Sequence, residues 1–167
     1  MVSGLPGSGK SYFASRLALR LGAHYITSDR TRKAMDRMGR YTFEDKLMVY
    51  EQMVVLARDA LQLGNDMVVD ATFYRQSFRE LFFKLADEFH QPIYLMEVVA
   101  DEAVVKERLL RPRRESEADY NVYLHIKSQF ENFEEPHLVL QSVNGTADHN
   151  LEIALEYIKP VHEGMRH

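Results

Sequence analysis

The sequence contains no cysteine and no tryptophan, and only five of its 167 residues are proline. The absence of cysteine excludes disulfide bonds and thiolate metal sites, which is typical of proteins from a reducing cytoplasm. No apolar run is long enough to span a membrane, and no segment has the pattern of a signal peptide. We therefore expect a cytoplasmic protein without a membrane partner.

Several motifs of other protein classes are missing as well. The chain has no N-K-x-D element of a GTPase, no H-E-x-x-H metal site and no G-x-S-x-G nucleophile elbow. A formal net charge of −4 argues against extensive contact with a nucleic-acid backbone, because such domains usually carry a basic face. A small-molecule partner is thus favoured over a nucleic acid, and the oligomeric state stays open.

The most specific feature is the stretch GLPGSGKS, which fits the phosphate-binding loop G-x-x-x-x-G-K-[ST]. Its glycines let main-chain N–H groups approach an anion, Lys10 is expected to reach the β- and γ-phosphates, and Ser11 to ligate Mg²⁺. Only three residues precede the loop, although a buried parallel strand usually has about five. The nucleotide-binding residues are expected to be Gly4, Pro6, Gly7, Ser8, Gly9, Lys10, Ser11 and Tyr12.

Strand and helix patterns alternate along the rest of the chain. Strands are expected at residues 24–29, 67–72, 92–100 and 137–143, and helices at 11–22, 42–64, 75–89, 101–110, 123–133 and 151–158. With 46% hydrophobic residues and no repeats, the chain should form one α/β domain over residues 1–167. Such alternation predicts a parallel sheet with helices on both faces.

Acidic residues follow two of these strands, at the edge of the sheet where ligands bind. Asp70 ends an apolar run and resembles a Walker B acid, which with Ser11 would hold Mg²⁺. Asp29 is followed three residues later by Arg32, one helical turn away. Asp29 is either a base for an attacking hydroxyl, with Arg32 steadying the acceptor, or simply the N-cap of a helix starting at Arg30.

Four arginines, Arg108, Arg111, Arg113 and Arg114, gather around Pro112. The simpler interpretation is a basic helix end that interacts favourably with the helix dipole. The functional interpretation is a lid whose arginines close over the nucleotide and neutralise charge during transfer, and the density of arginines favours it. Arg108 and Arg111 are then expected to bind the nucleotide.

Together these motifs resemble the small P-loop kinases related to the kinase domain of phage-type polynucleotide kinase, and the "AAA domain" ATP-binding proteins grouped with them. The resemblance covers GLPGSGKS, S-D-x-x-R from Ser28, VVDAT and RLLRPR. It implies a three-layer P-loop fold with five parallel strands and a lid at about 111–133. Phe73 and Tyr74 depart from the polynucleotide kinases, which tend to have Asn in this region, and they suggest a stacking surface for another acceptor.

The expected activity is an ATP- and Mg²⁺-dependent transfer of the γ-phosphate to a hydroxyl of a small or nucleoside-type acceptor. A polynucleotide 5′-hydroxyl kinase and an ATP-binding regulatory module without an acceptor are the alternatives. The resemblance implies that Asp29 is the general base and Arg32 an acceptor-site arginine. The expected catalytic residues are Lys10, Asp29, Arg32, Arg111 and Arg114.

Overall fold

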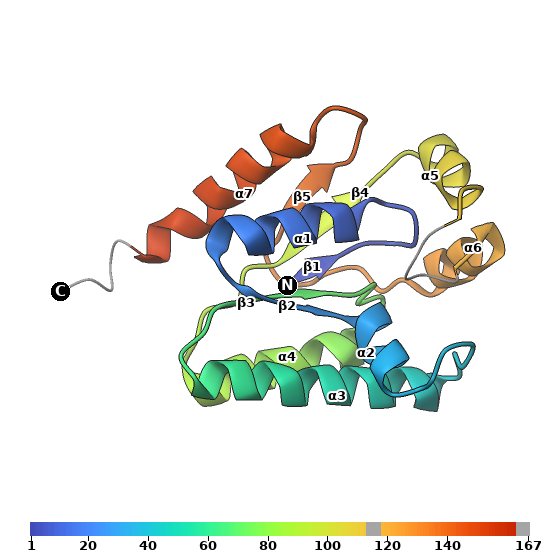
Figure 1. Cartoon of the computed structure of the whole chain (residues 1–167). Helices are drawn as coiled ribbons and strands as arrows, with labels where there is room; N and C mark the ends of the chain where they lie inside the picture. Colours follow the sequence, from blue (N-terminus) through green and yellow to red (C-terminus); the bar gives the residue numbers. More distant parts are fainter. Residues whose placement is uncertain (113–117, 163–167) are drawn as a thin grey trace.

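The computed structural model describes residues 1–112 and 118–162, with side chains through residue 158. Its centre is a sheet of five parallel strands in the order β2-β3-β1-β4-β5 (Figure 1). The strands are β1 (Val2–Ser3), β2 (His24–Thr27), β3 (Met67–Asp70), β4 (Met96–Val99) and β5 (Leu138–Gln141). The predicted all-parallel α/β architecture, with the phosphate-loop strand in the middle, is confirmed.

Seven helices occur in the described part of the chain, and they cover both faces of the sheet. They are α1 (Lys10–Leu21), α2 (Ser28–Ala34), α3 (Phe43–Gln62), α4 (Gln76–Phe89), α5 (Glu102–Leu109), α6 (Tyr120–Gln129) and α7 (Ala147–His162). Figure 1 shows α1 and α7 on one face, α3 and α4 on the other, and α5 and α6 beside the phosphate-loop end. None of the described helices is both long and apolar enough to cross a membrane.

The two faces of the sheet bury two separate apolar cores. Consecutive strand residues point to opposite faces, so Val68 of β3 packs beneath α1 and α7, while Val69 packs against α3 and α4. The core beneath α3 and α4 is rich in aromatic rings, and the Tyr50 and Phe78 rings stack with centroids 4.3 Å apart. Tyr50 of α3 and Phe78 and Phe82 of α4 therefore serve the core.

Predicted helix ends are confirmed where a glycine or a capping residue in the sequence marks them. Gly22, with a positive φ of 62°, follows α1. Thr42 caps α3, because its hydroxyl accepts a hydrogen bond from the Asp45 N–H at 3.1 Å. Asp101 occupies the N-cap position of α5 but makes no side-chain capping hydrogen bond.

Other element bounds differ from the prediction. The strand expected at 92–100 is only β4 (Met96–Val99), which pairs with β5 over its whole length and with β1 at Met96 and Glu97. The helix expected to reach Phe133 ends at Gln129, since Phe130 and Phe133 turn to pack on the Arg79 guanidinium. The last helix, α7, begins before residue 151 and continues beyond Pro160 to His162.

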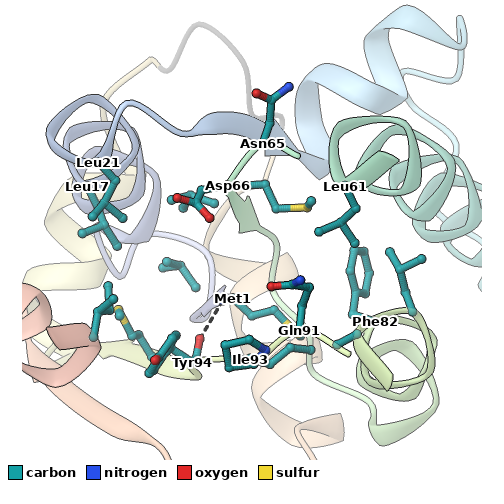
Figure 2. A pocket seen from close by; sticks show the side chains of 18 of the residues that line it. Met1, Leu17, Leu21, Leu61, Asn65, Asp66, Phe82, Gln91, Ile93 and Tyr94 are labelled. Atoms are coloured by element: carbon teal, nitrogen blue, oxygen red, sulfur yellow. Dashed lines mark hydrogen bonds between the residues drawn. The ribbon is translucent and has the colours of Figure 1, made fainter. Parts of the chain in front are cut away.

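A cavity of about 260 Å³ lies at the amino ends of the strands, opposite the phosphate loop (Figure 2). Figure 2 shows Leu17 and Leu21 on one side of it and Leu61 and Phe82 on the other. The Met1 amino group donates a hydrogen bond to the Tyr94 carbonyl oxygen at 2.7 Å. Ligands of parallel α/β sheets bind at the carboxyl ends of the strands, so this cavity at the amino ends is not the nucleotide site.

Arg79 of α4 is fully buried and contacts two other segments, the turn just before α4 and the distant segment after α6. Its guanidinium donates to the carbonyl oxygens of Phe73 (2.7 Å), Asn132 (3.1 Å) and Glu131, and lies 3.9 Å from the centroid of the Phe133 ring. Burial lowers the pKa of this guanidinium from its ordinary value. These contacts attach the turn after β3 and the segment after α6 to α4.

We predict that Arg79→Met destabilises the fold by about 2–4 kcal/mol, because three buried carbonyl oxygens lose a charged donor. Urea denaturation measures the free energy of unfolding. Arg58→Met is the matched control, since Arg58 forms an exposed ion pair with Glu88 and lies 5.6 Å from the centroid of the Phe89 ring, and its loss should cost less than about 1 kcal/mol. Equal losses in the two variants would contradict the role given to Arg79.

Candidate active site

The phosphate loop leaves β1 and leads directly into α1, which begins at Lys10. A Cβ atom at Gly4 would lie 2.7 Å from the Val98 carbonyl oxygen, and one at Gly9 would lie 2.6 Å from the Ser142 hydroxyl oxygen. Gly9 also has a φ of 89°, which side-chain-bearing residues rarely adopt. The loop therefore needs glycine at both positions to pack between β4 and the segment that follows β5.

The other expected loop residues differ in exposure. Pro6 is buried beside Lys10, and Ser8 is buried with its N–H donating to the Leu5 carbonyl oxygen at 3.1 Å. The Ser8 hydroxyl has no hydrogen-bond partner among the described residues. Tyr12 is 61% exposed, and the Arg16 guanidinium lies 5.3 Å from its ring centroid. Tyr12 thus offers an accessible ring at the start of α1.

Two cavities meet at Lys10. The first, called here the Arg108 cavity, has a volume of about 650 Å³ and lies between the loop, Tyr12, Arg108 and residues 142–148. The second, called here the tyrosine cavity, has a volume of about 470 Å³ and lies between α2, α3 and α6. Its lining includes Tyr41, Tyr50, Tyr74, Asp29, Arg32 and Lys46. Lys10 lines both cavities.

The two residues expected to hold a metal are brought together by Tyr25. The Tyr25 hydroxyl donates to Asp70 Oδ2 at 2.6 Å and lies 3.3 Å from the Ser11 carbonyl oxygen. Asp70 is buried at the end of β3, and burial together with this carboxylate raises the Tyr25 pKa above its ordinary value. Tyr25 therefore stays a neutral donor and orients the carboxylate.

This donor set fits Mg²⁺. Asp70 Oδ1 is buried and has no hydrogen-bond partner in the described part of the chain, so it keeps a free lone pair beside the start of α1. Ser11 is exposed in the Arg108 cavity. Mg²⁺ in nucleotide sites needs only one or two protein oxygens, because water and phosphate supply the others. No group of three His, Cys, Asp or Glu side chains suited to a metal exists among the described residues.

Asp29 does not cap α2, and the capping interpretation is wrong. Thr27 is the N-cap, since its hydroxyl accepts the Arg30 N–H at 3.1 Å and α2 begins at Ser28. Asp29 lies in the first turn with its carboxylate 3.4 Å from Arg32 Nη1. Arg32 is only 6% exposed and lies 4.7 Å from the centroid of the Tyr41 ring. Both residues line the tyrosine cavity.

The arginines of the expected lid occupy different positions. Arg108 Nη1 donates to the Ser142 hydroxyl at 3.0 Å and to the Gly7 carbonyl oxygen at 3.3 Å, so it already contacts the phosphate loop. Arg111 is largely exposed and pairs with Glu107 at 3.0 Å. Arg113 and Arg114 lie outside the described residues, as does part of the expected lid at 111–133.

Sequence reasoning missed Tyr25 and Lys46 and misplaced Phe73. Phe73 is fully buried with a φ of 48°, so only Tyr74 of this pair lines the tyrosine cavity. Lys46 Nζ donates to the Tyr74 hydroxyl at 3.1 Å and lies 4.9 Å from its ring centroid. The one available signal for Tyr25 was its place in a strand that ends at the ligand edge of the sheet.

One curated protein and two solved structures are similar to this chain. A curated relative, "Probable adenylyl-sulfate kinase" of Aeropyrum pernix, is 26% identical over 97% of this chain and 92% of the relative. An unliganded sugar kinase from Janibacter sp. has a TM-score of 0.73 at 17% identity, covering 99% of this chain and 96% of that chain. The APS kinase of Mycobacterium tuberculosis in complex with AMPPNP and APS has a TM-score of 0.73 at 15% identity, covering 93% and 94%.

The two structural likenesses show a shared fold, that of P-loop kinases. At the level of sequence families, residues 1–136 match the family described as "AAA domain". This match includes the phosphate loop, the D-x-x-R element and the Asp70 strand, which are the motifs behind the predicted resemblance. The chain belongs to the AAA domain family.

Proposed function

We propose that the protein is an ATP- and Mg²⁺-dependent phosphotransferase that moves the γ-phosphate of ATP to a hydroxyl group of a small molecule. The observation that supports this proposal is the position of Lys10 in the wall of both cavities. The lysine of a phosphate loop reaches the β- and γ-phosphates. A nucleotide in the Arg108 cavity therefore directs its terminal phosphate towards the tyrosine cavity, where an acceptor has room.

The chain's own residues divide the work of the proposed reaction. The loop N–H groups and Lys10 hold the phosphates, and Ser11 and Asp70 hold Mg²⁺, which when bound neutralises phosphate charge. Asp29 accepts the proton of the acceptor hydroxyl as that oxygen bonds to the γ-phosphorus and the β–γ bridging oxygen leaves with ADP. Arg32 orients the Asp29 carboxylate through their 3.4 Å contact. Arg108 braces the loop from the other side.

Arg111 and Arg114 are proposed to neutralise charge when the lid closes. Arg111 lies just after the end of α5 and is exposed, and its partner Glu107 is also exposed. Exposed ion pairs of this kind contribute little to stability, so exchanging Glu107 for a phosphate costs little.

A small acceptor fits the site better than a nucleic acid. The tyrosine cavity of about 470 Å³ is within the usual range for small-molecule sites. The chain's net charge of −4 does not favour contact with a phosphate backbone. The similar proteins support the same choice, since they are named as an adenylyl-sulfate kinase, a sugar kinase and an APS kinase in complex with APS.

The test uses γ-labelled ATP and Mg²⁺ with a metabolite mixture or with a 5′-hydroxyl oligonucleotide. We expect label on a small molecule and a loss of about 10²–10⁴-fold in transfer rate for Asp29→Asn, because the base is removed. ATP binding, measured by calorimetry, should remain. Asp59→Asn on the exposed face of α3 is the matched control and should keep full activity.

Three results would contradict parts of this proposal. Label on the oligonucleotide identifies a polynucleotide kinase. Phosphate release without any labelled acceptor identifies an ATP-hydrolysing module. An unchanged transfer rate in Asp29→Asn shows that Asp29 is not the general base.

A second prediction concerns Tyr25, a positioning residue for the metal. Tyr25→Phe removes the hydrogen bond to Asp70 at little change of volume, and we expect Mg²⁺ affinity to fall about tenfold or more. The readout is the Mg²⁺ concentration needed to tighten ADP binding in calorimetry. Tyr94→Phe, at the far cavity, is the matched control. An unchanged Mg²⁺ requirement in Tyr25→Phe would remove the tyrosine from this role.

A further inference from the structure

We propose that Arg32 and Lys46 form an anion-binding subsite in the tyrosine cavity. This inference rests on the proposed function and names its acceptor class. The acceptor is a small molecule that carries a phosphate, sulfate or carboxylate group in addition to the hydroxyl that receives the γ-phosphate.

Arg32 has unused donors in a buried position. It is only 6% exposed, and its Nε has no hydrogen-bond partner among the described residues. Its contact with the Asp29 carboxylate is long, at 3.4 Å. Buried polar groups in native proteins are nearly always paired, so an orphaned guanidinium nitrogen beside a cavity calls for a ligand. A guanidinium is suited to hold phosphate, sulfate or carboxylate through two parallel hydrogen bonds.

Lys46 adds a second positive charge from α3 to the same cavity. Its one hydrogen-bond partner in the described part of the chain is the neutral hydroxyl of Tyr74. No carboxylate of the described residues forms an ion pair with it. An ammonium group has three donors, so at least two are available to a ligand.

The charges of the described residues that line the cavity are unbalanced. Among the described residues that line it, Lys10, Arg32 and Lys46 are cationic and Asp29 is the carboxylate. Lys10 is committed to the nucleotide in the proposed reaction, and Asp29 to the acceptor hydroxyl. Arg32 and Lys46 remain for a negatively charged part of the acceptor.

A purely structural role explains Arg32 poorly. Arg79 shows how this chain satisfies a buried structural guanidinium, with three backbone carbonyl oxygens and the face of an aromatic ring. Arg32 has a ring, that of Tyr41, but no such set of acceptors among the described residues. A neutral acceptor would leave its Nε unpaired, and sites built around such groups discriminate strongly against ligands that cannot pair them.

The test measures binding by calorimetry to protein saturated with Mg²⁺ and AMPPNP, so that the Arg108 cavity is filled. The probes are three matched pairs: ribose 5-phosphate and ribose, AMP and adenosine, gluconate and glucose. We expect an anionic member to bind at least about tenfold more tightly than its neutral partner, as a charge-assisted hydrogen bond implies. Lys46→Met should lose about tenfold or more of that affinity, whereas Lys46→Arg, which keeps the charge, should retain most of it.

Affinity for AMPPNP must change less than twofold in both Lys46 variants, which shows that the fold and the phosphate loop are intact. Equal binding of charged and neutral partners, no binding of any anionic probe, or an unchanged preference in Lys46→Met would each overturn the anion subsite. Phosphate transfer is measured separately with labelled ATP. Anion preference without transfer would overturn the proposed reaction and leave the subsite standing.

Discussion

The site depends on how closely the phosphate loop packs against its neighbouring strands. Backbone atoms at Gly4 and Gly9 approach the Val98 carbonyl and the Ser142 hydroxyl so closely that no Cβ would fit. β1 lies between β3 and β4, and the loop that follows it packs against β4 and the segment after β5 before α1 begins at Lys10. The loop therefore separates two cavities and presents one lysine to both.

The hydrogen bonds of three buried polar side chains separate a structural residue, Arg79, from two residues proposed to bind ligands, Arg32 and Asp70. The Arg79 guanidinium donates to backbone carbonyl oxygens and so fixes the turn after β3, which carries Tyr74 of the tyrosine cavity. Arg32 and Asp70 are also buried, yet each keeps an atom without a partner among the described residues, and each lies at the carboxyl edge of the sheet. Unpaired buried groups are costly, so their retention at this edge agrees with a role in binding substrate and metal.

The sequence predicted what local patterns determine. The phosphate loop, the Thr42 cap and the alternation of strands and helices all follow from neighbouring residues. Asp29 was left open as a candidate N-cap of α2, and Thr27 takes that position instead, because Thr27, Ser28 and Asp29 are all capable caps and the end of β2 decides between them. Tyr25 and Lys46 were missed since their partners lie 45 and 28 residues away. The bounds of β4 likewise match its pairing with β5, which is not adjacent in sequence.

The shared lysine makes the two cavities thermodynamically linked. Phosphates that neutralise Lys10 lower the positive potential of the tyrosine cavity, so a negatively charged occupant of that cavity is held less tightly beside ATP than in its absence. By thermodynamic linkage, the two ligands lower each other's binding affinity by the same factor. In the proposed reaction the phosphorylated product carries more negative charge than the acceptor did. Its repulsion from ADP across the loop then favours departure, which makes negative cooperativity a means of turnover.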